Sequence, residues 1–187
     1  MSADDPVQPD FEALERIAQE KAGQRNLLFA LIGNMSYCWS NNESMFIYVL
    51  QYLIRTDEIT ATIIFGTLNT TRARIDLVER LAEAKLADKD AATQLRRIIR
   101  RFNECTKLRN EFNHSVFKTD SEGAITHTHS MRIQRRNGQL HLGELKPVDQ
   151  QRIEAMGAAI KKMVKLNREI WQFLPMLRQA MDDTECT

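Results

Sequence analysis

Three residues near the middle of the chain have the types and the spacing to act on a phosphodiester. Arg109 is followed directly by Asn110, and His114 comes four residues later, within the segment 107–118. On a helix, Asn110 and His114 would lie one turn apart on the same face. An arginine holds a phosphate through two parallel donors, and a histidine exchanges a proton near neutral pH. The three side chains together therefore predict phosphodiester chemistry.

The sequence contains no strong competing set of reactive residues. We find no carboxylate pair, glycine-rich phosphate loop or serine nucleophile elbow. His127 and His129 point to one face of an expected strand and could hold a metal ion with His141. No Asp, Glu or Cys accompanies them at ligand spacing, so we interpret them as packing or solvent residues. We therefore expect neither a metal ion nor another cofactor.

Basic residues gather around the same segment. Residues 94–118 carry seven Lys or Arg against two Glu, and an RNA backbone would be attracted to that surplus. Arg100 with Glu104 and Lys107 with Glu111 are each four residues apart, so part of the run also fits an ordinary solvated helix face. No aromatic platform is interleaved with these cations, which argues against a dedicated groove for single strands. The candidate RNA-binding residues are Lys107, Lys118, Arg100, Arg135 and Arg136.

The pattern Arg-Asn-x-x-x-His, formed by Arg109, Asn110 and His114 after a long amphipathic helix, resembles the motif of the HEPN superfamily (higher eukaryote and prokaryote nucleotide-binding domains). The resemblance covers residues 24–180, although its specific part is the motif alone, and the expected hairpin lies outside the family's minimal helical core. It implies metal-independent RNA cleavage, in which the ribose 2′-hydroxyl attacks the neighbouring phosphate. His114 would then transfer the proton, Arg109 would clamp the phosphate and Asn110 would orient one of them.

The resemblance leaves two classes of function open. The first is an endoribonuclease that serves as a toxin, in phage defence or in RNA stress control, with RNA and a protein antitoxin as candidate partners. The second is a non-catalytic helical dimer that binds a nucleotide, RNA or a protein partner. A purely structural role, in which the motif residues cap helix carbonyls, is the third interpretation.

One chain supplies only one histidine to the motif. Cleavage by 2′-hydroxyl attack needs one group to remove a proton and another to protonate the leaving oxygen. A two-fold dimer would bring two copies of His114 and of Arg109 around one phosphate, and the HEPN resemblance implies the same arrangement. We therefore expect a homodimer with a composite site in a basic cleft.

The elements that must position these residues are mostly helical. Glycine and proline number only 7 and 4 in 187 residues, and apolar residues recur at three- and four-residue spacing. We expect an all-α fold, an antiparallel bundle of four main helices with a short N-terminal helix and one β-hairpin. The expected ranges are 10–23 for the short helix, 26–52, 68–86, 88–112 and 147–177 for the main helices, and about 124–145 for the hairpin. Asp88 is expected to cap its helix, Pro147 to open the last one, and Asn137-Gly138 to form the hairpin turn.

Several smaller features bear on the packing. The apolar run 59–65 predicts a buried turn. Asn42 and Glu43 interrupt an apolar seam, and we favour a role in helix register over one facing the Arg–His site. The aromatic residues at or beside seam positions are interpreted as core or dimer contacts. They are Trp39, Tyr48, Tyr52 and Trp171.

Charge and cysteine usage limit the class of protein. The 26 Lys and Arg balance the 25 Asp and Glu, so net charge gives no argument for nucleic acid or membrane. We find no export signal and no apolar run of membrane-spanning length, and three widely separated cysteines predict no disulfide framework. We expect a cytoplasmic protein without a membrane partner. Its expected parts are a flexible tail at 1–9, one HEPN-like domain at 10–181 and an acidic tail at 182–187.

Overall fold

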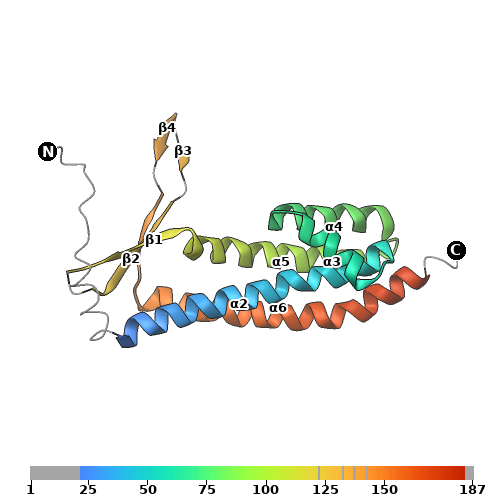
Figure 1. The fold of residues 1–187 in the computed structure, drawn as a ribbon, viewed down its shortest axis with the longest axis horizontal. Helices are drawn as coiled ribbons and strands as arrows, with labels where there is room; N and C mark the ends of the chain where they lie inside the picture. Colours follow the sequence, from blue (N-terminus) through green and yellow to red (C-terminus); the bar gives the residue numbers. More distant parts are fainter. Residues whose placement is uncertain (1–21, 122, 132, 137, 142, 184–187) are drawn as a thin grey trace. The chain divides into compact units, whose positions relative to one another are not determined.

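The computed structural model describes residues 22–183 except 122, 132, 137 and 142. This part of the chain is mostly helical, which confirms the expected fold class (Figure 1). None of its helices is long and apolar enough to cross a membrane. The expected tail at 1–9 and nearly all of the expected helix at 10–23 lie outside the described residues. The helices are α2 (Ala22–Ile54), α3 (Glu58–Thr67), α4 (Thr71–Lys85), α5 (Lys89–Asn113) and α6 (Gln150–Asp183); the strands are β1 (Ser115–Thr119), β2 (Ile125–Ser130), β3 (Gln134–Arg136), β4 (Gln139–His141) and β5 (Leu145–Pro147).

The chain divides into two compact units by its internal contacts. Among the described residues, the first unit consists of 22–33 together with Glu111–Ala155, and the second consists of Asn34–Asn110 and 156–183. Each unit is described by itself. All three boundaries fall inside long helices, so α2, α5 and α6 contribute residues to both units. The single domain expected from the sequence stays a prediction.

The core of the second unit forms where α2, α5 and α6 meet. Phe46 of α2 and Phe102 of α5 have ring centroids 5.1 Å apart, and Trp39 stacks on Phe102 at 5.9 Å. The fully buried Asn42 amide donates to the carbonyl of Met163 on α6 at 3.0 Å. Asn42 therefore links α2 to α6, the kind of contact expected of a residue that fixes helix register.

The same contacts give the helix directions within this unit. Positions further along α2 meet positions further along α6 but earlier positions on α5. The helix α5 consequently runs opposite to both α2 and α6 (Figure 1). The buried residues of α5 follow the apolar spacing predicted from the sequence. They are Ala91, Leu95, Ile98, Ile99, Phe102 and Phe112, whereas Cys105 and Leu108, which have the same spacing, are half-buried.

The short helix α3 corrects one expectation. The run 59–65 was expected to be buried, but only Ala61 and Phe65 are, whereas Ile59 is 73% and Ile63 is 63% exposed. The physical reason is that a helix packed on one side buries one stripe, and a continuous apolar run places residues all round it.

Four helices begin at a side chain that caps them. Asp57, Thr70, Asp88 and Asp149 each accept a hydrogen bond from the backbone N–H three residues later, at the starts of α3, α4, α5 and α6. A cap of this kind satisfies one of the free N–H groups of the first turn. The expected cap Asp88 is confirmed, whereas Pro147 does not open the last helix because it pairs with β2 as the end of β5.

The first unit contains all the strands. The sheet order is β1-β2-β5, entirely antiparallel, and β3 pairs with β4 in a separate hairpin. The turn expected within the hairpin is confirmed at Gly138, whose φ of +78° suits glycine. The hairpin itself is shorter than the expected 124–145, because β2 pairs with β1 and β5 and only β3 and β4 close around this turn. The sequence did not predict β1 and β5, because strands of five and three residues carry too few alternations to show a period of two.

A close backbone approach makes Gly143 a point of expected sensitivity. A Cβ at this position would lie 2.0 Å from the carbonyl oxygen of Ser130. We expect Gly143→Ala to lower the free energy of unfolding by about 1–3 kcal/mol, because the backbone must shift to admit the methyl group. The matched control is Gly157→Ala on α6, where no atom lies within 4 Å and the change should stabilise the helix by about 0.5–1 kcal/mol. Urea unfolding of both variants tests this, and effects of equal sign would contradict it.

Candidate functional site

Arg109 is held in place near the end of α5. Its guanidinium carbon lies 4.2 Å from the centre of the Trp39 ring, and its Nη1 donates to the Asn110 side-chain oxygen at 2.9 Å. The Trp39 indole in turn donates to the Thr106 hydroxyl at 2.8 Å and stacks on Phe102. A cation above an indole face is attracted by the ring quadrupole. The position of Arg109 is therefore set by the core of the second unit.

The remaining donors of this arginine define what it can bind. Arg109 is half-buried, and its Nε is buried without a hydrogen-bond partner in the described part of the chain. Its Nη2 also has no partner among the described residues. Two N–H groups on that nitrogen can thus donate to an anion, and the bond from Nη1 to Asn110 fixes their direction. Asn110 is the residue that orients the arginine.

His114 follows α5 by one residue and belongs to the first unit, whereas Arg109 and Asn110 belong to the second. The His114 side chain is exposed, and its backbone carbonyl accepts a hydrogen bond from the N–H of Met131 at 3.1 Å. One residue further on, the Ser115 hydroxyl donates to the carbonyl at the end of α5. The backbone at His114 is therefore held while its imidazole faces solvent.

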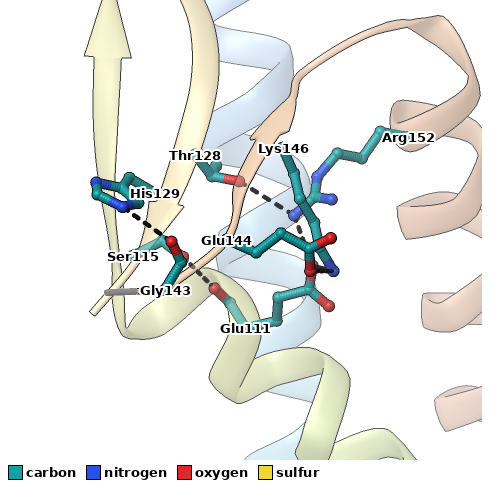
Figure 2. Close-up of polar contacts among 8 residues, drawn as sticks. All are labelled: Glu111, Ser115, Thr128, His129, Gly143, Glu144, Lys146 and Arg152. Atoms are coloured by element: carbon teal, nitrogen blue, oxygen red, sulfur yellow. Dashed lines mark hydrogen bonds and ion pairs between the residues drawn. The ribbon is translucent and has the colours of Figure 1, made fainter. Parts of the chain in front are cut away.

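Glu111, inside the motif, is the centre of an ionic cluster that the sequence did not predict (Figure 2). Its Oε1 accepts from Lys146 Nζ at 2.9 Å and from Arg152 Nη2 at 2.8 Å. The same Arg152 nitrogen donates to the Thr128 hydroxyl at 3.1 Å, and the guanidinium carbon lies 4.7 Å from the centre of the Phe112 ring. The cluster ties the end of α5 to β2, β5 and the start of α6, and so positions the segment that carries His114.

The partners of Glu111 could not be predicted from helical spacing along α5. Lys107 precedes Glu111 by four residues on the same helix, which fitted a solvated helix face, whereas the ion pairs of Glu111 are with Lys146 and Arg152 of its own unit. The two cations lie 35 and 41 residues further along the chain. Helix periodicity relates only residues three or four apart, so no local signal points to either partner.

The pKa of Glu111 reflects this cluster. Burial acts to raise the pKa of the carboxyl, but the hydrogen bonds and positive charges of Lys146 and Arg152 outweigh it and hold that pKa below its ordinary value. The hydrogen bond with Glu111 raises the pKa of Lys146 in turn, although burial opposes it. The stability that Glu111 contributes is therefore present above its unfolded pKa, about 4.3, and is lost as the pH falls through the lower folded value.

We expect Glu111→Gln to lower the free energy of unfolding at pH 7 and to change it less at pH 3. At pH 3 the solution is below the ordinary pKa of a glutamate in the unfolded chain, about 4.3, so protonation of the unfolded state has already removed part of the stability that the cluster supplies. Glu144→Gln is the matched control, because the exposed Glu144 carboxylate lies 3.6 Å from Lys146 Nζ and adds little. Urea unfolding at the two pH values measures the difference. An equal penalty for Glu111→Gln at pH 3 and pH 7 would show that the charge does not hold the cluster.

The five candidate RNA-binding residues are divided between the two units. Arg100 and Lys107 are exposed on α5, and Arg100 forms no ion pair with Glu104 in the described part of the chain. Successive helical residues are about 100° apart, so Lys107 lies on the side of α5 opposite Arg109, which faces Trp39. The other three belong to the first unit: Lys118 and Arg135 are exposed on β1 and β3, and the Arg136 side chain lies outside the described residues.

The histidines of the strands do not form a metal site in the described part of the chain. The Nε2 atom of His129 lies 3.1 Å from the carbonyl oxygen of Gly143 (Figure 2). His127 lies two residues earlier on β2, and the side chain of His141 is outside the described residues. Among the residues that the structure describes, no three His, Cys, Asp or Glu side chains gather closely enough to hold a metal ion.

The described cysteines are poor candidates for a nucleophile. Cys38 and Cys105 are both free, and burial raises the pKa of each thiol. A raised pKa lowers the fraction of thiolate, which is the nucleophilic form. Cys186 lies outside the described residues.

Comparison with known proteins found no relative of this chain. No family model matches the chain, and no curated protein or solved structure is detectably similar to it. The function is therefore argued from the geometry around Arg109, Asn110 and His114.

Proposed function

We propose that the protein is a metal-independent endoribonuclease of the HEPN type. The observation that carries the proposal is the Arg109 guanidinium, seated on Trp39 and joined to Asn110, on the helix that leads to the exposed His114. A cation fixed in advance stabilises developing negative charge without reorganising during the reaction. A solvent-facing imidazole can exchange protons near neutral pH.

The proposed reaction needs only the RNA and the residues of the motif. The ribose 2′-oxygen bonds to the adjacent phosphorus while the bond from phosphorus to the 5′-oxygen breaks. One His114 takes the proton of the 2′-hydroxyl, and a second His114 delivers a proton to the leaving 5′-oxygen. Arg109 binds the phosphate oxygens through Nη2, and Asn110 keeps it oriented. The products are a 2′,3′-cyclic phosphate and a 5′-hydroxyl.

The need for two histidines leads to a homodimer. Each chain brings one His114 and one Arg109 to a composite site, with a basic surface around it. Light scattering at micromolar concentration is expected to give twice the mass of one chain. A monomer with full nuclease activity would refute the composite site.

A free ribonuclease would damage the RNA of its own cell, so its activity has to be restrained or triggered. We therefore propose a role as a toxin, in phage defence or in RNA stress control, with a protein antitoxin as candidate partner and the cytoplasm as the place of action.

The second candidate is a non-catalytic helical dimer that binds a nucleotide, RNA or a protein partner. It is favoured by the engagement of Arg109, which is half-buried and already gives one donor to Asn110. An arginine so engaged can serve packing as well as catalysis.

Incubation of the purified protein with several RNAs in excess chelator separates the two candidates. We expect the RNA to be cut at a rate that the chelator does not change. Intact RNA across all substrates, with the protein folded and dimeric, would leave only the binding module.

A further inference from the structure

The exposed face of α6 in the second unit combines cations with an aromatic ring. We define the α6 strip as Lys161, Lys165, Arg168, Trp171 and Arg178, all of which are exposed. They recur at three, four and seven residues, so they share one side of the helix over a length of about 25 Å. Trp171 lies between the cations along the axis. We infer that the α6 strip binds single-stranded RNA, with one base stacked on Trp171.

The charge of the strip is not balanced locally. None of its four cations forms an ion pair with a residue of the described chain. The acidic residue within 161–178 is Glu169, which pairs with Arg101 of α5. The carboxylates of Asp182 and Asp183 follow only after the strip ends. Asp182 and Asp183 line the same hollow as Arg178, so a phosphate backbone is attracted chiefly by Lys161, Lys165 and Arg168, whose neighbour Glu169 is already paired with Arg101.

Trp171 is presented as a stacking platform. Its ring is 54% exposed and lies 6.0 Å, centroid to centroid, from the ring of Tyr48 at an interplanar angle of 37°. The contact with Tyr48 limits the orientations of the indole, while more than half of its surface remains available. Tyr37, 66% exposed, lies three helical turns before Tyr48 and so on the same side of α2. Exposed aromatic rings beside a cationic row are the elements of single-strand binding.

The surface along the strip is hollowed on both sides of the indole. One shallow hollow of about 590 Å³ is lined by Lys161, Lys165 and Arg168 together with Glu169. A second of about 510 Å³ is lined by Trp171 and Arg178 together with Asp182 and Asp183. Bases that leave the stack can enter such hollows while the phosphates follow the cations.

Charge complementarity favours RNA over the other occupants. A second copy of the chain, docked symmetrically, would bring the same four cations face to face. Val164 and Trp171 are the large apolar side chains that α6 exposes in the described part of the chain, which is little for a membrane-bound face. The choice of RNA among single strands rests on the proposed function.

Binding is tested with a fluorescently labelled oligomer of twelve uridines and the full chain carrying His114→Ala, so that cleavage does not consume the probe. We expect Trp171→Ala to weaken the affinity about five- to hundredfold, the range for loss of one stacked base, and Trp171→Phe to retain most of it. Ile59→Ala on α3, which also removes an exposed apolar side chain, is the matched control and should bind like the parent chain.

Salt dependence tests the cations separately. Lys165→Gln combined with Arg168→Gln should lower the slope of log affinity against log salt by about 1.4, because two phosphate contacts are lost from a single strand. The control pair Arg80→Gln with Lys85→Gln, two exposed cations of α4, changes the charge equally and should leave the slope unchanged.

Unchanged RNA affinity in Trp171→Ala would overturn the inference, and so would equal salt slopes in the two charge variants. It would also be overturned if the strip variants kept their RNA affinity but lost the mass of a dimer or lost binding to anionic lipid vesicles. The outcome is distinct from that of the proposed function. If the wild-type chain binds RNA through the α6 strip but never cuts it, the proposed nuclease activity is refuted and the inference about the strip stands. If Trp171→Ala still cleaves RNA with an unchanged KM, the nuclease is supported and RNA binding by the α6 strip is refuted.

Discussion

Replacing His114 by alanine is expected to lower the rate of RNA cleavage by about 10²- to 10⁴-fold, the range that one general acid or base contributes. The fold should survive, because the His114 imidazole is exposed and the contact with Met131 is made by the backbone. His127→Ala, which removes a histidine of β2, is the matched control and should cut at nearly the wild-type rate. Initial rates and urea unfolding of the two variants measure both effects.

A mixed dimer sharpens this expectation. A dimer of one wild-type chain and one His114→Ala chain has one proton-transfer residue where the reaction needs two. It should be strongly impaired, well below half of the wild-type rate. A rate of half would mean that each chain cuts on its own, which contradicts the composite site.

The largest expected loss of stability comes from Phe102→Ala. Phe102 is fully buried between Phe46 and Trp39, so the truncation leaves a cavity in the core of the second unit. The cost should be about 3–5 kcal/mol in the free energy of unfolding. Arg109→Ala removes a half-buried cation from the Trp39 ring and should cost less, about 0.5–2 kcal/mol. Urea unfolding of the two variants gives the comparison.

The same comparison decides what Arg109 is for. A small loss of stability in Arg109→Ala together with a large loss of cleavage would mark a catalytic group. If Arg109→Ala unfolds as readily as Phe102→Ala, the arginine is structural and the site assignment is wrong.

The buried stripe of α5 shows what the sequence could predict. Leu95, Ile98, Phe102 and Phe112 recur at helical spacing and are buried. Cys105 and Leu108 belong to the same predicted stripe but are half-buried. The cap at Asp88 and the turn at Gly138 were predictable too, because each depends on residues within four positions along the chain.

The surroundings of the motif could not be predicted in the same way. Trp39 lies under Arg109 although the two are far apart in the sequence, and Lys146 and Arg152 reach Glu111 from other elements. Such contacts depend on how the helices and strands pack, which a single sequence does not encode locally. The exposure of Ile59 has the same origin, since apolar character alone does not say which side of a helix faces the core.

The most direct test of the central claim is the chemistry of the RNA ends produced in excess chelator by the wild-type protein and by His114→Ala, purified side by side. The account predicts 2′,3′-cyclic phosphate and 5′-hydroxyl ends from the wild type and their disappearance in the variant. Products with 3′-hydroxyl and 5′-phosphate ends, or cyclic phosphate formed equally by both proteins, would contradict it.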